Sequence, residues 1–243
     1  MILYPVVILA GGLATRLRPI TEKIPKALVE VGGKPFIAHQ LRLLHFHGMR
    51  RVVISAWYRG DMIRDYVGDG SEFDMQVSYV FDGDKPLGTG GAVRRALNHL
   101  QEPFFILYGD SYLPCNYEEI QAAFESSAQP ALMTVYRNEG KWDTSNVEMR
   151  GGTLVKYDKN DRSPAMEFID YGLGICQPDV FKNIQDGEST DLADIYRDLA
   201  QEKKLAAYIV QQRFHEIGSH KGLRELDEVL KKDSNHFLFK EKP

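Results

Sequence analysis

The sequence has little cysteine and no long hydrophobic stretch. Cys115 and Cys176 are the two cysteines among 243 residues, too few for a disulfide-stabilised scaffold, and neither lies in a Cys-x-x-Cys or Cys/His metal-binding pattern. The apolar run near the N-terminus stops at Gly11-Gly12 and is too short to span a bilayer. No basic segment with a cleavage pattern marks it as a signal peptide. We therefore expect a cytoplasmic protein with no membrane partner.

Several catalytic patterns are also missing. His39, His45 and His47 have no acidic or thiol neighbours and do not form the His-Glu-x-x-His spacing of zinc enzymes. A solvated helix face explains them better. Ser111 follows Asp110 but lies outside a nucleophile-elbow context, and no Ser/His/Asp or Cys/His set can be recognised. The sequence therefore does not predict a covalent nucleophile.

Charge is unevenly distributed along the chain. The composition, 43% hydrophobic and 26% charged, is typical of a globular protein, and the formal net charge is −4. Residues 1–60 nevertheless hold nine Lys or Arg and two Asp or Glu, a balance of +7 that leaves −11 for the remainder. A basic N-terminal quarter on an acidic protein indicates a local anion site. A nucleic-acid surface would more often make the whole domain basic, so we expect no nucleic-acid partner.

Strand and helix patterns alternate through the first half of the chain. The spacing predicts strands at 4–10, 51–56, 75–81 and 104–108, and helices at 35–47, 61–67 and 89–100. This alternation indicates βαβ units. We therefore predict an α/β fold with a Rossmann-like, doubly wound, mostly parallel sheet.

After residue 110 the rhythm is less regular. The predicted helices are 117–126, 191–201 and 221–231, and the predicted strands are 131–136, 147–157, 168–175, 205–210 and 213–217, with Gly151-Gly152 interrupting the second strand. No internal repeat, low-complexity tract or Pro/Ser linker occurs. We therefore expect a single domain over residues 1–243, with a mixed sheet and an elaborated second half.

The segment from Leu9 to Lys26 is the most informative part of the sequence. It follows the first predicted strand and precedes the first helix, so it lies at the carboxyl edge of the sheet, where ligands bind. Gly11-Gly12 lets the backbone approach a ligand, and Arg16 and Lys26 add positive charge suited to phosphate. The segment lacks the ending of a P-loop. A basic, solvated loop with turn glycines is the alternative interpretation.

A second glycine-rich stretch, Pro86 to Val93, runs directly into a predicted helix. Helix N-termini attract anions, and glycines leave room for a flat base or a phosphate. Read as Gly-x-Gly-x-x-Gly, it has Gly88 and Gly90, but Val93 fills the third position. With Asp110 about twenty residues further on, a dinucleotide-binding oxidoreductase is a competing interpretation. A simple helix N-cap with close strand packing is another.

Acidic residues at strand ends are candidates for a metal site. Asp110 follows a buried strand and a glycine, which suits a Mg²⁺ ligand beside a phosphate-containing substrate. Glu216 follows a short β-prone segment late in the chain. Asp158-Lys159, at another strand end, would suit a sugar hydroxyl and a phosphate. Each of these residues is equally compatible with a solvated turn or a helix cap.

Together, these segments resemble the sugar-1-phosphate nucleotidyltransferase family. Its signature, GGxxTRLxPxTxxxPKxxxxxxxKP, is matched from Gly11-Gly12 to Lys34-Pro35. The LGTGGA stretch, the GDS segment and the closing Glu216–Leu223 segment fall in the family's order, so the resemblance covers residues 4–232. It implies a nucleotide-binding half over residues 1–112, a sugar-phosphate-binding half over 113–232 and a tail over 233–243.

The resemblance implies a Mg²⁺-dependent enzyme that transfers a nucleoside monophosphate from an NTP to a sugar 1-phosphate. It assigns nucleotide contacts to Leu9, Ala10, Gly11, Gly12, Thr15, Gly88, Thr89 and Gly91, catalytic contacts to Arg16 and Lys26, sugar-phosphate contacts to Asp158, Lys159, Asp170 and Gly172, and Mg²⁺ to Asp110 and Glu216. The chain departs from the family pattern at two positions. Glu216 stands where Asp is usual, and Asp170 where Asn is usual.

Substrate identity is less sharply indicated. The likeness is greatest to a small bacterial branch, which favours GTP with D-glycero-D-manno-heptose 1-phosphate. UTP with N-acetylmuramate 1-phosphate or another hexose 1-phosphate is the alternative. A catalytically silent nucleotide or sugar-phosphate sensor is a third interpretation, because Glu216 replaces the usual Asp. A homo-oligomer is compatible with the sequence, which does not specify the oligomeric state.

Overall fold

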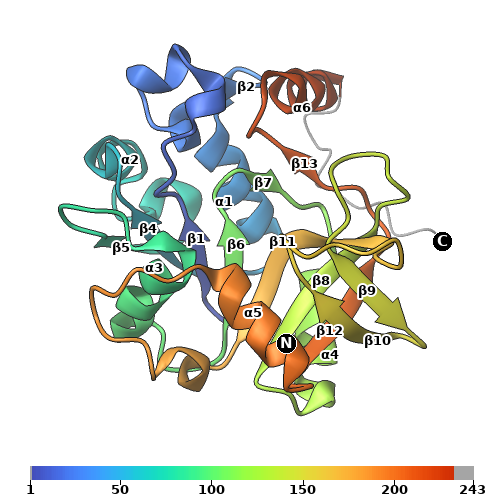
Figure 1. Cartoon of the computed structure of the whole chain (residues 1–243). Helices are drawn as coiled ribbons and strands as arrows, with labels where there is room; N and C mark the ends of the chain where they lie inside the picture. The colour runs from blue at the N-terminus through green and yellow to red at the C-terminus, as the bar shows by residue number, and fades with distance from the viewer. Residues whose placement is uncertain (1, 233–243) are drawn as a thin grey trace.

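The computed structural model describes residues 2–232, which fold around a nine-stranded mixed sheet (Figure 1). The strand order is β10-β9-β11-β6-β1-β4-β5, and β8 pairs with both β11 and β12. The strands are β1 (Val6–Leu9), β4 (Arg51–Ala56), β5 (Gln76–Phe81), β6 (Phe104–Tyr108), β8 (Ala131–Arg137), β9 (Val147–Arg150), β10 (Thr153–Tyr157), β11 (Phe168–Cys176) and β12 (Leu205–Val210). β6, β1, β4 and β5 are parallel, whereas β11 runs antiparallel to β6 and β8.

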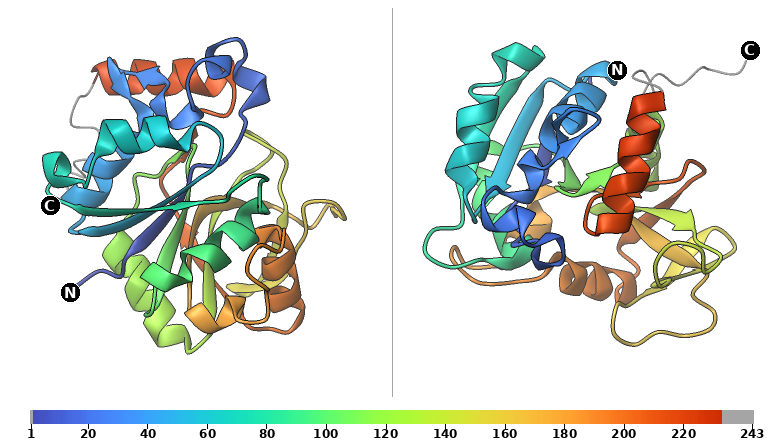
Figure 2. Two further views of the ribbon diagram at one scale, coloured as in Figure 1. Left: turned by 90° about the vertical axis from the view of Figure 1, so that its left-hand side faces the viewer. Right: turned by 90° about the horizontal axis from the view of Figure 1, so that it is seen from above.

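Helices cover both faces of the sheet (Figure 2). They are α1 (Phe36–Phe46), α2 (Gly60–Val67), α3 (Gly88–Ala96), α4 (Tyr117–Ser127), α5 (Leu192–Gln201) and α6 (His220–Lys232). α1, α2 and α4 contribute to the hydrophobic cluster that contains Ile8, and α3 and α5 to the cluster that contains Val7. Because successive strand residues point to opposite faces, the two groups of helices lie on opposite sides of β1.

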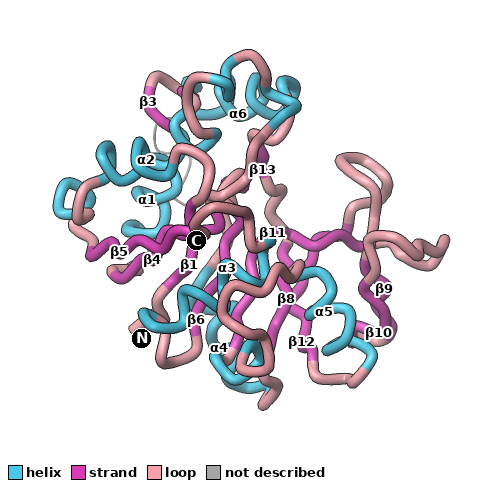
Figure 3. The backbone as a smooth tube through the Cα atoms, turned by 60° about the vertical axis from the view of Figure 1, so that its left-hand side comes forward, coloured by secondary structure: helices cyan, strands magenta, loops and turns pink. Residues whose placement is uncertain are grey.

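The last helix returns to the N-terminal half of the molecule. Leu226 and Leu230 of α6 are buried together with Val31 of β2 (Glu30–Val31) and Phe36 of α1. Figures 1 and 3 both show α6 on the side of the molecule occupied by β2 and β3 (Lys34–Pro35). The chain that leads into α6 forms β13 (His215–Glu216), which pairs antiparallel with β7 (Ser111–Tyr112). This return brings Glu216 and Ile217, late in the chain, beside Asp110 and Ser111.

The predicted fold class, an α/β fold with a mostly parallel, doubly wound mixed sheet, is confirmed. One predicted strand, 147–157, is instead a hairpin, because Gly151 and Gly152 both have positive φ (+55° and +81°), as a tight two-residue turn requires. The predicted helix 89–100 ends at Ala96 and continues as a 3₁₀ turn, Leu97–His99. The predicted tail 233–243 lies outside the described residues. Within residues 2–232, none of the helices has the length and apolar character needed to cross a membrane.

The start of α5 is joined to the start of α3. Asp191, the N-cap of α5, accepts hydrogen bonds from the N–H of Ala193 (2.9 Å) and the hydroxyl of Thr89 (2.8 Å). The N–H of Leu192 in turn donates to the Thr89 hydroxyl oxygen (2.8 Å). The two side chains therefore cap α5 and fix it against the glycine-rich segment that begins α3.

Replacing Asp191 tests this junction. Asp191→Ala should lower the free energy of unfolding by about 1 kcal/mol, because an N-cap side chain and its link to Thr89 are lost together. Urea denaturation gives the value. The control is Asp194→Ala, which removes an exposed ion pair with Arg197 on the same helix and should cost less than about 0.5 kcal/mol. Equal losses in both variants would contradict the assigned role of Asp191.

Candidate active site

The candidate site lies where β1 and β6 end side by side. Gly109 follows β6, and its N–H donates to the carbonyl of Leu9 (3.0 Å). A Cβ on Gly109 would lie 2.4 Å from that carbonyl oxygen, so only glycine allows the two chains to come this close. The next residue, Asp110, is thereby placed at the carboxyl edge of the sheet, directly beside the segment that follows β1.

A cavity of about 280 Å³ lies at this edge. Of the residues predicted to bind nucleotide, those that line it are Leu9, Ala10, Gly11, Gly12, Gly88 and Thr89, together with Lys26 and Asp110. Thr15 and Gly91 are not among the residues that line it. The cavity therefore brings together the two glycine-rich segments that the sequence analysis selected, one after β1 and one at the start of α3.

The glycines at the start of α3 are packed against the chain before α5. The N–H groups of Gly90 and Gly91 donate to the carbonyl of Thr190 (2.8 and 3.2 Å). A Cβ on Gly88 would lie 2.5 Å from the same carbonyl oxygen, and one on Gly91 would lie 2.3 Å from that of Glu188. These amides are therefore engaged by the protein rather than directed at an anion. A nucleotide contact at Gly91 stays a prediction.

A second cavity, of about 580 Å³, adjoins the first. The two share Tyr108 and Asp110, so these residues form the wall between them. The predicted residues that line the second cavity are Arg16, Lys159, Asp170, Gly172 and Glu216. It also contains residues that the sequence analysis did not select, among them Trp142, Asn146, Arg213, Phe214 and Glu225. They lie in loops or on α6 without a recognisable motif, so no local signal identified them.

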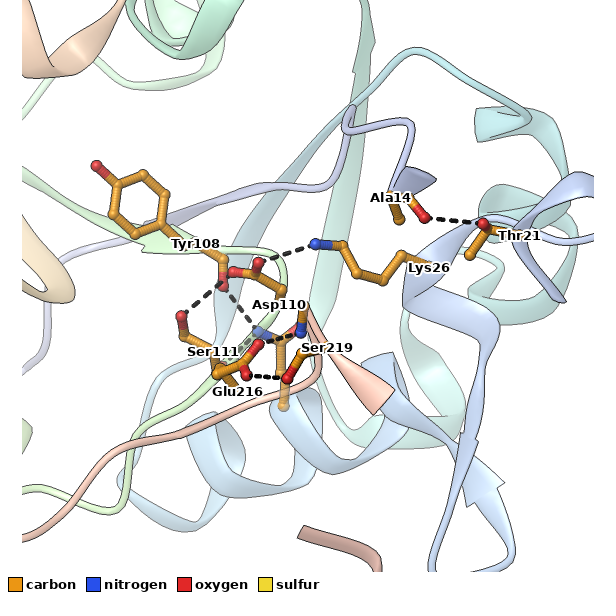
Figure 4. Close-up of polar contacts among 10 residues, drawn as sticks. Ala14, Thr21, Lys26, Tyr108, Asp110, Ser111, Glu216 and Ser219 are labelled. Atoms are coloured by element: carbon orange, nitrogen blue, oxygen red, sulfur yellow. Dashed lines mark hydrogen bonds and ion pairs between the residues drawn. The ribbon is translucent and has the colours of Figure 1, made fainter. Parts of the chain in front are cut away.

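Asp110 and Lys26 form an ion pair at the boundary of the two cavities (Figure 4). The Nζ of Lys26 lies 2.8 Å from Oδ2 of Asp110, and the two side chains are 17% and 30% exposed. Gln40 holds the backbone on either side, because its amide donates to the carbonyls of Tyr108 (3.1 Å) and Ser111 (2.8 Å). The carboxylate is therefore fixed in position and partly shielded from water.

Glu216 reaches the same place through the β7–β13 pairing, in which it lies opposite Ser111. Its carboxylate accepts hydrogen bonds from the hydroxyl of Ser219 (2.8 Å) and the N–H of Gly218 (Figure 4). A Cβ on Gly218 would lie 2.6 Å from Oε2 of Glu216, 3.4 Å from Oδ2 of Asp110 and 3.1 Å from Nη2 of Arg16. Because it lacks a Cβ, Gly218 lets two carboxylates and a guanidinium meet in one small space.

Asp110 and Glu216 could hold a divalent cation in this space. Mg²⁺ commonly takes one or two protein carboxylates and completes its octahedron with water and substrate phosphate oxygens. Asp110 and Glu216 supply two carboxylates beside the Gly218 space. Among residues 2–232 no group of three or more His, Cys, Asp or Glu could hold a metal ion. A cation here would therefore need ligands from the substrate and water as well. The arrangement therefore suits a cation that arrives with a phosphate ligand.

Asp158 and Lys159, which were predicted to act as a pair, have different positions in the structure. Asp158 is not among the cavity residues; its Oδ1 accepts the N–H groups of Asn160 and Asp161 (both 2.8 Å), which lower the pKa of its carboxyl. Lys159 lines the second cavity, with its Nζ 5.7 Å from the centre of the Tyr108 ring. Asp158 thus shapes the turn that presents Lys159.

Asp170 is a partly enclosed carboxyl group facing Lys159. One oxygen accepts the N–H of Gly172 (2.9 Å), and the other lies 3.5 and 3.4 Å from the hydroxyls of Tyr108 and Tyr157. Burial raises the pKa of the Asp170 carboxyl, although Lys159 and these hydrogen bonds act in the opposite direction. Burial also raises the pKa of Tyr108 well above its usual value, so its hydroxyl remains a donor.

Two unpartnered polar groups belong to residues of the first cavity that the sequence analysis missed. Ser55 and Asp82 are 1% and 7% exposed, and both line this cavity. Oδ2 of Asp82 accepts the N–H of Leu87 (2.9 Å), but Oδ1 of Asp82 and Oγ of Ser55 have no hydrogen-bond partner within residues 2–232. Buried polar atoms are normally satisfied, so these two are exceptions on residues that line the first cavity.

Comparison with known proteins places the chain among nucleotide-transferring enzymes. The sequence profile of the family described as nucleotidyl transferase matches residues 5–233. The chain is 28% identical over 220 residues to the mannose-1-phosphate guanylyltransferase catalytic subunit beta of Xenopus tropicalis; the match covers 88% of this chain but 61% of the relative's length.

Shorter relatives match over more of their own length. The D-glycero-alpha-D-manno-heptose 1-phosphate guanylyltransferase of Campylobacter jejuni is 26% identical, with 87% of this chain and 93% of that protein covered. The N-acetylmuramate alpha-1-phosphate uridylyltransferase of Neisseria meningitidis is 29% identical, with 78% and 82% covered. The crystal structure of HddC from Yersinia pseudotuberculosis complexed with GMP-PN has the same fold, with a TM-score of 0.74 at 23% identity over 94% of this chain and all of that one.

The raised pKa of Asp170 predicts how the stability of the protein depends on pH. Because the pKa of Asp170 is raised in the folded protein, its ionisation opposes folding once the pH exceeds the unfolded value of about 3.9. Asp170→Asn removes that cost. Urea unfolding should therefore show the variant gaining stability relative to the wild type as the pH rises from about 4 towards neutrality.

Asp158→Asn is the matched control, with the opposite sign. The pKa of Asp158 is lowered in the folded protein, so its ionised form stabilises the fold above about pH 3.9, and this contribution is lost as the pH falls. The variant should be less stable than the wild type near neutrality, with the difference closing in acid. If both variants showed the same pH trend, the opposite pKa shifts assigned to Asp170 and Asp158 would be wrong.

Proposed function

Because this chain belongs to the nucleotidyl transferase family, we propose that it transfers a nucleoside monophosphate from a nucleoside triphosphate to a sugar 1-phosphate, releasing pyrophosphate. The product is a nucleoside diphosphate sugar. The protein is accordingly a sugar-1-phosphate nucleotidyltransferase, and we place it in the cytoplasm, where such precursors of cell-surface polysaccharides would be made.

One observation carries this proposal: two cavities meet at a wall made by Tyr108 and Asp110. The first, framed by glycine-rich segments, suits a nucleotide, and the second, with Lys159, suits a sugar phosphate. Transfer between two substrates requires their reacting atoms to lie a few ångströms apart in a fixed orientation. A shared wall that carries the Asp110 carboxylate, with Lys26 ion-paired to it on the side of the first cavity, supports that arrangement.

The reaction needs charge stabilisation more than proton transfer. An oxygen of the sugar 1-phosphate, already anionic at neutral pH, attacks the α-phosphorus of the nucleotide. The bond from that phosphorus to its bridging oxygen breaks, and the electron pair leaves with pyrophosphate. No general base is required. Arg16 and Lys26 would bind the triphosphate and the developing charge, and Lys159 would hold the phosphate of the sugar.

Asp110 and Glu216 would hold Mg²⁺ in the space beside Gly218. When bound, the ion supplies positive charge that offsets the repulsion between the two phosphate substrates. The Lys26–Asp110 ion pair contributes in the free protein, because it holds the Asp110 carboxylate in one orientation in a partly shielded position. Ser219 and the N–H of Gly218 orient the Glu216 carboxylate in a similar way.

We further propose GTP as the nucleotide. A carboxylate is an acceptor only, and guanine presents two adjacent donor groups, N1–H and the exocyclic N2 amine. The buried Oδ1 of Asp82, unpartnered within residues 2–232, suits such donors, whereas uracil offers one N–H between two carbonyls that would face the carboxylate. Similarity to the Campylobacter heptose guanylyltransferase supports a heptose 1-phosphate as the sugar.

Arg16→Ala and Asp110→Ala test the proposed chemistry. Each should lower kcat by roughly 10²-fold or more, the scale of losing a major electrostatic stabiliser. Pyrophosphate release from GTP and heptose 1-phosphate at saturating Mg²⁺ measures it. Arg51→Ala, which removes an exposed ion pair with Glu102 at the amino end of β4, is the control and should retain wild-type rates. Near-normal turnover in either test variant would contradict the proposal, and no release by the wild type would favour a sensor.

Asp82→Asn tests the choice of base. The substitution places an amide that both donates and accepts where guanine requires acceptors, so kcat/KM for GTP should fall roughly 10-fold or more relative to that for UTP. Asp84→Asn, on the same loop but exposed, should leave the ratio unchanged. An equal loss for GTP, UTP, CTP and dTTP in Asp82→Asn would show that the residue does not distinguish bases.

A further inference from the structure

The sugar-side cavity continues into a third hollow. A groove of about 750 Å³ lies between the loop after β8 and the loop before β11, and it shares Trp142 and Asp143 with the second cavity. The first and second cavities share Tyr108 and Asp110. The three spaces therefore form a series, with the nucleotide cavity at one end and Trp142 between the second and third.

This series sets the direction of a bound sugar phosphate, an argument that rests on the proposed function. The phosphate of the sugar must lie at the Asp110 end of the second cavity, because it attacks a nucleotide bound in the first. The end of the sugar remote from that phosphate then points towards Trp142 and Asp143, where the third hollow begins.

An arginine stacked on a tryptophan forms this far wall. The guanidinium carbon of Arg213 lies 3.3 Å from the centre of the Trp142 ring, and Glu225 of α6 forms an ion pair with Nη2 of Arg213. The three residues come from three separate parts of the chain: the loop after β8, the segment before β13, and α6. Stacking and the ion pair together hold the planar guanidinium in one orientation.

The protein does not occupy all the hydrogen-bond donors of this guanidinium. The Arg213 side chain lines the second cavity and is 33% exposed, while its buried Nε has no hydrogen-bond partner within residues 2–232. Glu225 is also approached by Nζ of Lys221 at 3.8 Å. Arginine can only donate, and the indole N–H of Trp142 can also only donate. The chemistry of this wall therefore calls for oxygen acceptors on the ligand, such as hydroxyl or carboxylate groups.

We propose that Arg213, positioned by Trp142 and Glu225, is a specificity-determining residue that binds an oxygen-bearing extension of the sugar beyond its ring. The substrate class is a sugar 1-phosphate whose side chain is longer than the hydroxymethyl group of a hexose. A heptose, with one additional hydroxylated carbon, has this chemistry, and so does a sugar that carries a carboxyalkyl ether.

Paired substrates that differ only in the extension provide the test. D-glycero-D-manno-heptose 1-phosphate and mannose 1-phosphate share a ring configuration, and N-acetylmuramate 1-phosphate and N-acetylglucosamine 1-phosphate differ by the lactyl ether. Each is assayed with GTP and with UTP, by pyrophosphate release, on the wild type, Arg213→Ala and Arg213→Lys. The control is Arg224→Ala, an exposed arginine of α6 that lines none of the three cavities.

The wild type should prefer the extended member of one pair, and the preferred pair identifies the extension. Arg213→Ala should lower that preference roughly 10- to 100-fold, the scale of a hydrogen bond to a charged group, through KM and with kcat/KM for the short member unchanged. Arg213→Lys should restore little of it, because the planar stack is lost. Arg224→Ala should behave as the wild type.

An unchanged preference in Arg213→Ala would overturn the proposal, whether neither member of the pair loses activity or both lose it equally. The absence of pyrophosphate with every substrate in the wild type would remove the proposed function itself, and is thereby distinguished from failure of the inference alone. The fluorescence of Trp142, isolated in a Trp57→Phe background because the chain has two tryptophans, gives a second readout. It should respond to the extended sugar phosphate and not to its short partner.

Discussion

The pairing of β7 with β13 is the contact on which the site depends. It sets Glu216 opposite Ser111, and the N–H of Ile217 donates to the carbonyl of Asp110 (2.9 Å). The two acidic side chains thus converge only because the chain returns across the molecule late in its course. Burial of Leu226 and Leu230 against β2 and α1 stabilises that return. Hydrophobic packing of α6 therefore maintains an arrangement of like charges that would otherwise repel each other.

Most of the fold could be predicted because its signals are local. Alternating apolar runs and helical spacing identify the parallel strands and the helices that cover them, and the class follows. Three two-residue strands, β2, β3 and β7, could not be predicted in this way, since they are defined by their partners rather than by their own periodicity. The fourth, β13, lies within the predicted strand 213–217 but is shorter. The β9–β10 hairpin was visible only as a glycine pair, whose positive φ values decide the turn.

The residues of the site show the same difference between local signals and contacts remote in the sequence. Gly11, Lys26 and Asp110 stand in motifs with fixed spacing, so the sequence points to them, and the structure brings them to one cavity. Asp82 and Arg213 have no motif. Their significance depends on burial, on an unpartnered atom and on neighbours remote in the sequence, none of which spacing can reveal. Sequence reasoning therefore selected the residues in motifs better than Asp82 and Arg213, to which we assign the choice of base and sugar.

The common wall formed by Tyr108 and Asp110 has a consequence for inhibitor design. Fragments that occupy the two cavities separately each lose translational freedom on binding. A single compound joined across the wall loses it once, and its second half binds at an effective concentration set by the length of the linker. Because the two cavities adjoin at Tyr108 and Asp110, the linker need only be short.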